Sequence, residues 1–206
     1  TDTSGRTFRE ELYLTSTYIP QEPVDREEEL EKIAQAVRPL KHRRTPESLL
    51  VYGSAGIGKS TCVKHVLDTL GDQTKVKPIW INSWQYNTRP SLLTELLIQL
   101  GYPAPRKGKP VDELLSKLRE WLDKNRCVAV ALDEFDQLNA KTEVVYDLHM
   151  MSQDTKNKLG LVMVSNQPPS RLELDPRSES RVNWNTLKFK PYTKQQLTEI
   201  LERRIE

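Results

Sequence analysis

The residues best suited to chemistry lie in one octapeptide, GSAGIGKS, at positions 53–60. Its pattern, Gly-x-x-x-x-Gly-Lys-Ser, is that of the phosphate-binding loop of nucleotide triphosphatases. Glycines allow positive φ angles that turn backbone N–H groups toward a phosphate. Lys59 supplies a positive charge for the β- and γ-phosphates, and the Ser60 hydroxyl is a suitable Mg²⁺ ligand. The predicted binding residues are Gly53, Ser54, Ala55, Gly56, Ile57, Gly58, Lys59, Ser60 and Thr61.

The sequence on either side of this loop fits the same interpretation. Residues 49–52 predict a short buried strand, and residues 60–70 predict a helix whose N-terminal dipole attracts phosphate. The alternative is a glycine-rich turn that matches by chance. A strand before the turn and a helix after it favour the phosphate-binding loop.

A second group of reactive residues follows the apolar strand predicted at 127–132, which ends in Asp133-Glu134. Asp133 can hold Mg²⁺ through its waters, and Glu134 can orient and deprotonate an attacking water. Carboxylates at strand ends are often only solvated or helix caps. Downstream of a matched phosphate-binding loop, however, the pair favours nucleotide hydrolysis over simple nucleotide storage.

Asn166 follows the next predicted strand, 159–165. Its amide can hydrogen-bond the γ-phosphate or the attacking water, and the alternative is that it caps a turn before Pro168. We expect the phosphate-sensing role because of its place in the order of motifs.

Three arginines, Arg171, Arg177 and Arg181, come after this strand. Arginines near the end of such a domain can reach the phosphate bound by a neighbouring subunit, where one is worth several orders of magnitude in rate. For any single one of them, a solvated basic loop is an equally good interpretation.

Strands alternate with helices along the chain, which predicts an α/β fold with a parallel sheet and helices on both faces. A helix from about Asp25, with Asp25 as its N-cap and Glu28 as the partner, is expected to end at Pro39. A last helix is expected from Thr193, with Gln196 as its capping partner. The other predicted elements are strands 76–81 and 187–189, two amphipathic helices within 82–125, and a helix at 143–151.

Composition narrows the class of protein. The chain has 206 residues, 36% of them hydrophobic, which is enough for one large domain or for one domain and part of another. Its formal charge of +2 is nearly neutral and does not decide whether it binds nucleic acid. No apolar run approaches membrane-spanning length. The two cysteines, Cys62 and Cys127, are predicted to be core residues in a reducing compartment, so we expect an intracellular protein of the cytoplasm or nucleoid without membrane contact.

The order of these motifs resembles that of the AAA+ initiator ATPases of DNA replication, the archaeal origin-recognition proteins and their eukaryotic relatives. The segments that show the resemblance are 18–40, 49–61, 81–101, 128–138, 163–168 and 174–206. The resemblance implies a three-layer α/β/α domain, a central parallel sheet of five strands, and a helical insertion between the second strand and the strand ending in Asp133. It also implies that the cofactors are ATP or ADP and Mg²⁺.

The resemblance also implies roles for individual residues. Lys59, Asp133, Glu134 and Asn166 match catalytic positions, with Ser60 and Asp133 at the metal, and Arg181 looks like the finger that acts on a neighbouring subunit. Further nucleotide contacts are implied for Tyr18, Ile19, Arg26, Tyr192 and Arg204. The helical insertion corresponds to one that initiators use against DNA, so contacts to DNA phosphates are implied for Arg89, Arg106, Lys107 and Lys109.

The implied domain plan is an N-terminal extension, 1–24, docking near the nucleotide site, and an ATPase base domain, 25–206. The family continues into a helical lid and a winged-helix DNA-binding domain, both expected to be absent from this chain, so hydrolysis is expected to be slow and impaired. The implied function is origin recognition and helicase loading, with ATP as an assembly switch. The implied partners are double-stranded origin DNA, neighbouring initiator subunits and the replicative helicase. The alternatives are an AAA+ ATPase of the transposition or clamp-loader type and a STAND-like nucleotide-dependent signalling module.

Overall fold

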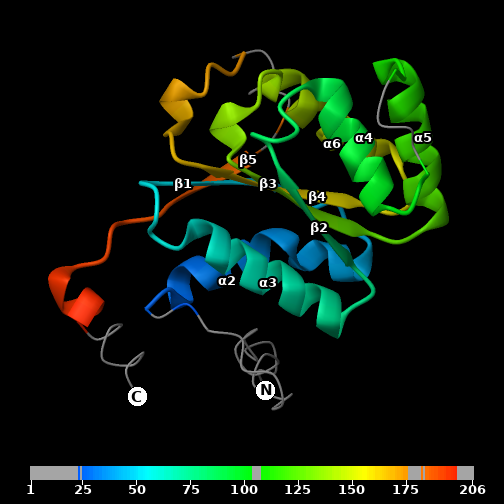
Figure 1. The fold of residues 1–206 in the computed structure, drawn as a ribbon. Coiled ribbons are helices and arrows are strands. Elements are labelled where there is room, and N and C mark those ends of the chain that lie inside the picture. The colour runs from blue at the N-terminus through cyan, green and yellow to red at the C-terminus, as the bar shows by residue number, and fades with distance from the viewer. Residues whose placement is uncertain (1–22, 24, 104–107, 176–181, 183, 199–206) are drawn as a thin grey trace, which may run out of the picture.

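The computed structural model describes residues 23, 25–103, 108–175, 182 and 184–198, and these form a central sheet between two layers of helices (Figure 1). The sheet has five strands in the order β2-β3-β4-β1-β5, and every pairing is parallel. The predicted α/β fold and its five-stranded parallel sheet are confirmed. The strands are β1 (Ser48–Tyr52), β2 (Lys77–Asn82), β3 (Val128–Asp133), β4 (Leu159–Ser165) and β5 (Trp184–Lys188).

The helices divide between the two faces of the sheet. In Figure 1, α2 and α3 lie on one face, and α4, α5 and α6 lie on the other. Because α4 and α5 lie between β2 and β3 in the chain, the predicted helical insertion is confirmed. The bounds are α2 (Glu27–Val37), α3 (Lys59–Gln73), α4 (Arg89–Gln99), α5 (Val111–Lys124) and α6 (Lys141–Asp154), with short 3₁₀ turns η1 (Arg38–His42), η2 (Phe135–Gln137) and η3 (Pro169–Arg171).

Each face of the sheet has its own apolar core, because successive side chains of a strand point to opposite faces. In β1, Leu50 packs with residues of α4, α5 and α6, whereas Leu49 and Val51 pack with residues of α2 and α3. Strands β3 and β4 read as continuous apolar runs because both of their faces are covered. Cys62 and Cys127 are buried in the second core as free thiols, as predicted. Within the described ranges, no helix is long and apolar enough to cross a membrane.

Strand order determines which loops meet at the carboxyl edge of the sheet. Strand β4 lies between β3 and β1, so the loops that follow these three strands are neighbours. Those loops contain Asp133-Glu134, Asn166 and the phosphate-binding motif. Ligands of open parallel sheets bind at this edge, and the topology therefore brings the three predicted motifs together.

Two details at the ends of elements differ from the predictions. Asp25 does not cap α2, because its φ of 54° is left-handed and the N-cap is Arg26, which has no side-chain cap bond. Strand β5 begins at Trp184 rather than at 187, because this edge strand is mostly exposed and has little of the apolar pattern that marks a buried strand. At the last helix, the Thr193 N–H donates to the Gln196 Oε1 at 2.9 Å and the Gln196 N–H donates to the Thr193 Oγ1 at 3.3 Å, so that capping pair is confirmed.

One ion pair fastens the helical insertion to the rest of the domain. The Arg89 guanidinium, at the start of α4, donates to both carboxylate oxygens of Asp147 on α6, at 2.7 and 2.8 Å. Asp147 is buried, and its hydrogen bonds hold the pKa of Arg89 above the usual value. The bidentate geometry makes this the strong form of an ion pair.

We expect Arg89→Ala and Asp147→Ala to be strongly non-additive in the free energy of unfolding. A double-mutant cycle in urea should give a coupling energy of about 1–3 kcal/mol, since each single variant leaves the same bidentate pair broken. The exposed pair Arg119–Asp154, whose closest atoms are 3.3 Å apart, is the matched control and should show a smaller coupling. Equal coupling energies in the two pairs would contradict an anchoring role for Arg89.

Candidate functional site

The phosphate-binding motif forms a tight turn between β1 and α3. Gly53 has a φ of 156°, and a Cβ atom there would lie 2.6 Å from the Phe189 carbonyl oxygen, so no side chain fits. Gly56 and Gly58 have φ angles of 75° and 92°, which glycine adopts without steric cost. Gly58 is the N-cap of α3 and has no side chain to cap it, so the first N–H groups of this helix remain available for an anion.

Lys59 is a buried cation at the first position of α3. Its Nζ donates to the Ser54 carbonyl at 2.6 Å and to the Asn166 Oδ1 at 3.0 Å. Burial lowers the pKa of Lys59, and the charges of Asp133 and Asp136 oppose that shift. The ammonium is therefore held between the loop and the tip of β4, with acidic groups close by.

The acidic strand end meets the other side of the loop. The Ser60 Oγ donates to the Asp133 Oδ1 at 3.0 Å, and the Glu134 N–H donates to the same oxygen at 2.9 Å. A hydroxyl beside a carboxylate is a donor set that suits Mg²⁺, which keeps several of its waters. Among the described residues, no three His, Cys, Asp or Glu side chains form a metal site, so a protein-only metal cage is absent from that part of the chain.

Glu134 lies at the bend between β3 and η2. Its φ of 50° and ψ of 42° are left-handed, a conformation that is uncommon for a residue with a side chain and that concentrates at functional sites. The bend turns the chain out of the sheet directly after Asp133. A hollow of about 420 Å³ lies beside it, lined by Trp84, Glu134, Asp136, Gln137 and Asn166.

Asp136 is a site residue that the sequence analysis missed. Its Oδ1 accepts the Asn166 N–H at 3.0 Å and so ties η2 to the tip of β4. Burial alone would raise the pKa of Asp136, but hydrogen bonds from the Asn166 backbone and from Gln137 hold it below the usual value. Its place three residues after Asp133, in the short turn that follows the strand, is the only local signal for it in the sequence.

Arg26 is engaged with the protein itself. Its guanidinium donates to the carbonyl oxygens of Ile57 and Lys190, both at 2.9 Å, and lies over the rings of Phe189 and Tyr192, at 4.9 and 4.1 Å from their centroids. Burial would lower its pKa, but hydrogen bonding with Tyr192 and Glu29 outweighs burial and raises it. Arg26 therefore joins the start of α2 to the phosphate-binding turn and to the segment after β5.

The remaining predicted residues divide into two groups. Tyr192 lies near the turn, with its hydroxyl 3.7 Å from where a Cβ of Gly58 would be. Arg89 is bonded to Asp147 as described above, and Lys109 forms an ion pair with Glu113 on α5. Seven predicted residues lie outside the described part of the chain: Tyr18, Ile19, Arg106, Lys107, Arg177, Arg181 and Arg204.

Comparison with known proteins bears directly on this site. The sequence profile of the family described as "AAA domain" matches residues 42–168, which include the phosphate-binding turn, Asp133, Glu134 and Asn166. The chain belongs to the AAA domain family. This AAA domain is also similar to archaeal proteins named as ORC1-type DNA replication proteins, which confirms the resemblance noted from the order of its motifs.

Two of these relatives have a similar extent of match. The ORC1-type DNA replication protein of Pyrococcus abyssi is 32% identical over 212 residues, covering 97% of this chain and 51% of that protein. For ORC1-type DNA replication protein 1 of Sulfolobus acidocaldarius, the identity is 30%, and the match covers 97% of this chain and 52% of that protein. The AAA domain thus spans about half the length of these relatives.

Solved structures agree with this assignment. The Aeropyrum pernix ORC1 protein, solved in complex with DNA, matches with a TM-score of 0.79 and 29% identity, over 97% of this chain and 53% of that one. The A. pernix ORC2 protein, solved as ADPNP–ADP complexes, matches with a TM-score of 0.73 and 25% identity, over 92% and 54%. Cdc6p of Pyrobaculum aerophilum shares the fold, with a TM-score of 0.78 at 24% identity over 92% and 52%.

Arg26→Ala should lower the free energy of unfolding by about 2 kcal/mol or more, since it removes two charged hydrogen bonds to backbone carbonyls, one buried and one partly buried. Arg26→Lys should recover only part of this, because lysine cannot donate in two directions from a planar group. Urea unfolding measures both. Arg38→Ala, which breaks an exposed pair with Glu31 of α2, is the control and should change the free energy of unfolding little. Equal losses from Arg26→Ala and Arg38→Ala would show that Arg26 does not hold the turn.

Proposed function

We propose that this AAA domain is the ATP-binding core of a DNA replication initiator, a member of an ATPase family whose bound nucleotide controls assembly. The observation that supports it most is the convergence of Lys59, Ser60, Asp133 and Asn166 within hydrogen-bonding distance at one edge of the sheet. Similarity to ORC1-type proteins over nearly the whole chain supports the initiator role. A neighbour solved as ADPNP–ADP complexes supports an adenine nucleotide as ligand.

In this proposal, the turn and the start of α3 bind the phosphates through their N–H groups and Lys59. Ser60 and Asp133 would hold Mg²⁺, with Asp133 acting through bound waters, and the ion would supply positive charge that offsets the charge of the phosphates. Glu134 orients a water and accepts its proton, and the hollow beside it gives that water room. Asn166 reports the γ-phosphate, since its amide already contacts Lys59. Tyr18, Ile19, Tyr192 and Arg204 complete the nucleotide contacts.

Arg26 is a supporting residue of the nucleotide site. Because its guanidinium is bonded to the Ile57 and Lys190 carbonyls, it supports the nucleotide site from behind the turn rather than by touching the adenine. It acts as a positioning residue. Its bond to Lys190 also gives the phosphate-binding turn a mechanical connection to the segment that continues the chain after β5.

Assembly and partners follow from the same proposal. Arg181 of one subunit would complete the site of the next, so that bound ATP favours the interface and hydrolysis releases it. Residues 1–24 form an extension that docks near the nucleotide, and 25–206 form the base domain. The partners are double-stranded origin DNA, contacted here through Arg106, Lys107 and Lys109, other initiator subunits and the replicative helicase.

The function is tested by two variants that should separate binding from turnover. Lys59→Ala should abolish ATP binding in an equilibrium titration, because it removes the buried cation between the phosphate-binding turn and Asn166. Glu134→Gln should bind ATP normally and lose turnover by a factor of 10² or more, because it removes the base and keeps the shape. Lys64→Ala, an exposed lysine on the same helix, is the control for the first variant.

ATP binding by Lys59→Ala that matches the wild type would refute the phosphate site. Unchanged turnover in Glu134→Gln, with binding intact, would remove Glu134 as the base but leave the nucleotide site in place.

A third variant tests whether Asp136 positions Asn166 for contact with the γ-phosphate. Asp136→Ala should reduce the preference for ATP over ADP, because the Asn166 backbone loses its acceptor, and Asp136→Asn should restore much of it. In an Asn166→Ala background, Asp136→Ala should cause little further loss of the preference for ATP, since the side-chain amide of Asn166 that Asp136 positions is already gone. Titration with both nucleotides measures this, and additive losses would show that Asp136 acts on stability alone.

A further inference from the structure

The loops that enter four of the five strands share one feature, which is a group of basic residues. The loop before β1 contains Lys41, Arg43 and Arg44. Lys75 and Lys77 precede or open β2, Lys124 and Arg126 precede β3, and Lys156 and Lys158 precede β4. These loops come from distant parts of the chain. Their basic residues are therefore scattered in the sequence, and the longest basic run among them is the one at 41–44. We call this set of residues the basic edge.

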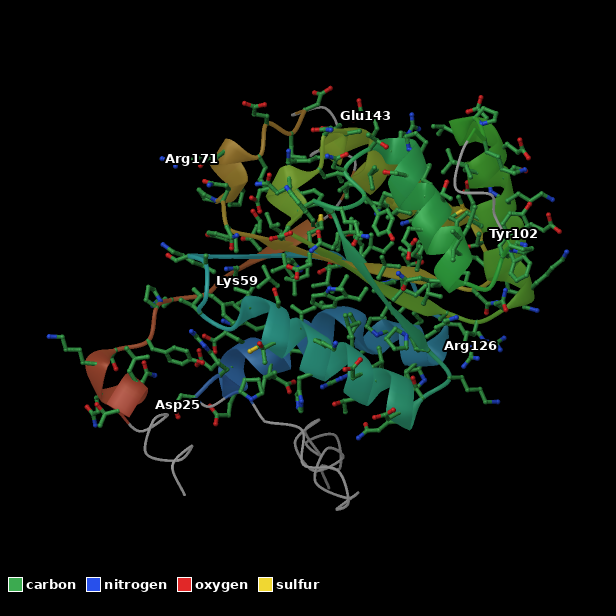
Figure 2. The ribbon with its side chains drawn as sticks, viewed as in Figure 1. Asp25, Lys59, Tyr102, Arg126, Glu143 and Arg171 are labelled. Atoms are coloured by element: carbon green, nitrogen blue, oxygen red, sulfur yellow. The ribbon has the colours of Figure 1, made fainter. Side chains whose placement is uncertain are left out.

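Parallel topology collects these loops at one edge. All strands run in the same direction, so every entering loop lies at the amino edge of the sheet, opposite the nucleotide site. In Figure 2, Arg126 and Lys59 lie toward opposite ends of the sheet. Backbone bonds join successive loops, with the Lys77 N–H donating to the Cys127 carbonyl at 2.9 Å and the Val128 N–H to the Lys158 carbonyl at 3.0 Å.

The spacing of the row follows from the sheet. The four strands are neighbours in the order β2-β3-β4-β1, and adjacent strands lie about 4.8 Å apart. The entrances to the four strands therefore span about 14 Å in a row that the sheet keeps rigid. The sheet fixes the backbone positions from which these side chains extend, which a free loop would not do.

Charge at this edge differs from that of the whole chain. The segments 41–47, 72–77, 123–127 and 154–158 contain nine basic and four acidic residues, a net charge of +5. The whole chain has a net charge of +2, so the remaining residues together carry −3. The basic edge is thus a local concentration of positive charge that the overall composition hides.

Seven of the nine members of the basic edge are exposed, and five of these carry the proposal. Arg43, Arg44, Lys75, Arg126 and Lys156 are exposed, and none of them makes an ion pair with another described residue.

Two of the acidic residues at this edge already have partners. Asp154 pairs with Arg119 at 3.3 Å, and Asp123 accepts the Lys156 N–H at 2.6 Å. Three members of the basic edge are engaged, since Lys77 donates to the Gln99 carbonyl, Lys124 pairs with Glu120, and Lys158 donates to the Thr155 carbonyl at 2.6 Å. The five cations named above are therefore the ones that an anionic partner would meet.

We propose that the basic edge binds the phosphate backbone of duplex nucleic acid, without reading its sequence. Arg43, Arg44, Lys75, Arg126 and Lys156, spread along neighbouring strand entrances, match a polymer that has a charge at every phosphate. Of the exposed large apolar residues in the described chain, Trp84 follows β2 at the carboxyl edge and Leu197 follows β5. The exposed side chains at the entrances of the four strands are mainly charged, which favours contact with phosphates over stacking of bases or insertion into a membrane surface.

The insertion loop offers a different set of cations. Arg106, Lys107 and Lys109 precede α5 in the chain, and none of them is a member of the basic edge, so substitutions can distinguish the two contacts. A duplex at the basic edge also leaves the nucleotide site at the carboxyl edge uncovered. The proposal therefore does not depend on ATP binding, and the two can fail independently.

Salt-dependent binding of a labelled random-sequence duplex of about 20 base pairs tests the proposal, by fluorescence anisotropy with the 206-residue chain. Arg126→Gln with Lys156→Gln should weaken binding about tenfold at 0.1 M salt and reduce the slope of log K against log salt by about 2, since two phosphate contacts are lost. Lys32→Gln with Lys64→Gln removes the same charge from exposed positions on α2 and α3 and is the matched control. It should leave the slope unchanged.

Equal effects from the two pairs would overturn the proposal, because they would show that only total charge matters. So would absence of duplex binding by the wild type at 50 mM salt, or an unchanged slope in the Arg126/Lys156 variant. Loss of all binding on replacing Arg106, Lys107 and Lys109, with the Arg126/Lys156 variant unaffected, would assign the contact to the insertion. Binding of anionic lipid vesicles but not of duplex would also overturn it.

Discussion

Two hydrogen bonds join the start of α3 to the tips of neighbouring strands and define the site, from Lys59 to Asn166 after β4 and from Ser60 to Asp133 at the end of β3. Both require β4 to lie between β1 and β3, because only then are the three tips adjacent. That strand order depends in turn on the two apolar cores that cover the faces of the sheet. The chemistry at the edge is thus a consequence of how the whole sheet is packed.

The phosphate-binding turn is held from behind as well as from its own strand and helix. Arg26 contacts the turn at Ile57 and the segment after β5 at Lys190, and two aromatic rings lie against its guanidinium. If the turn moves when a nucleotide binds or leaves, Arg26 would therefore transmit that movement to the segment after β5. In a switch protein, the segment leaving the base domain is where such movement would be most useful.

The sequence was sufficient for features that depend on local patterns. The glycine-lysine-serine motif, the apolar runs of β3 and β4, and the acidic strand end all identify themselves within a few residues. Features set by distant partners were missed: Asp136 bonds Asn166, which is 30 positions away, and the backbone of Asp25 is left-handed where a helix cap was expected. The exposed edge strand β5 was located only approximately, because half-exposed strands leave a weak apolar pattern.

Two glycines of the same turn are constrained by different forces. At Gly53 a methyl group would collide with the Phe189 carbonyl, whereas at Gly56 it would meet nothing within 4 Å, and only the positive φ opposes it. The obstacle at position 56 is thus one of handedness, which a mirror-image residue would remove. At position 53 the obstacle is the backbone oxygen of Phe189, just after β5, which every residue type carries, so no substitution at position 189 would make room for a side chain.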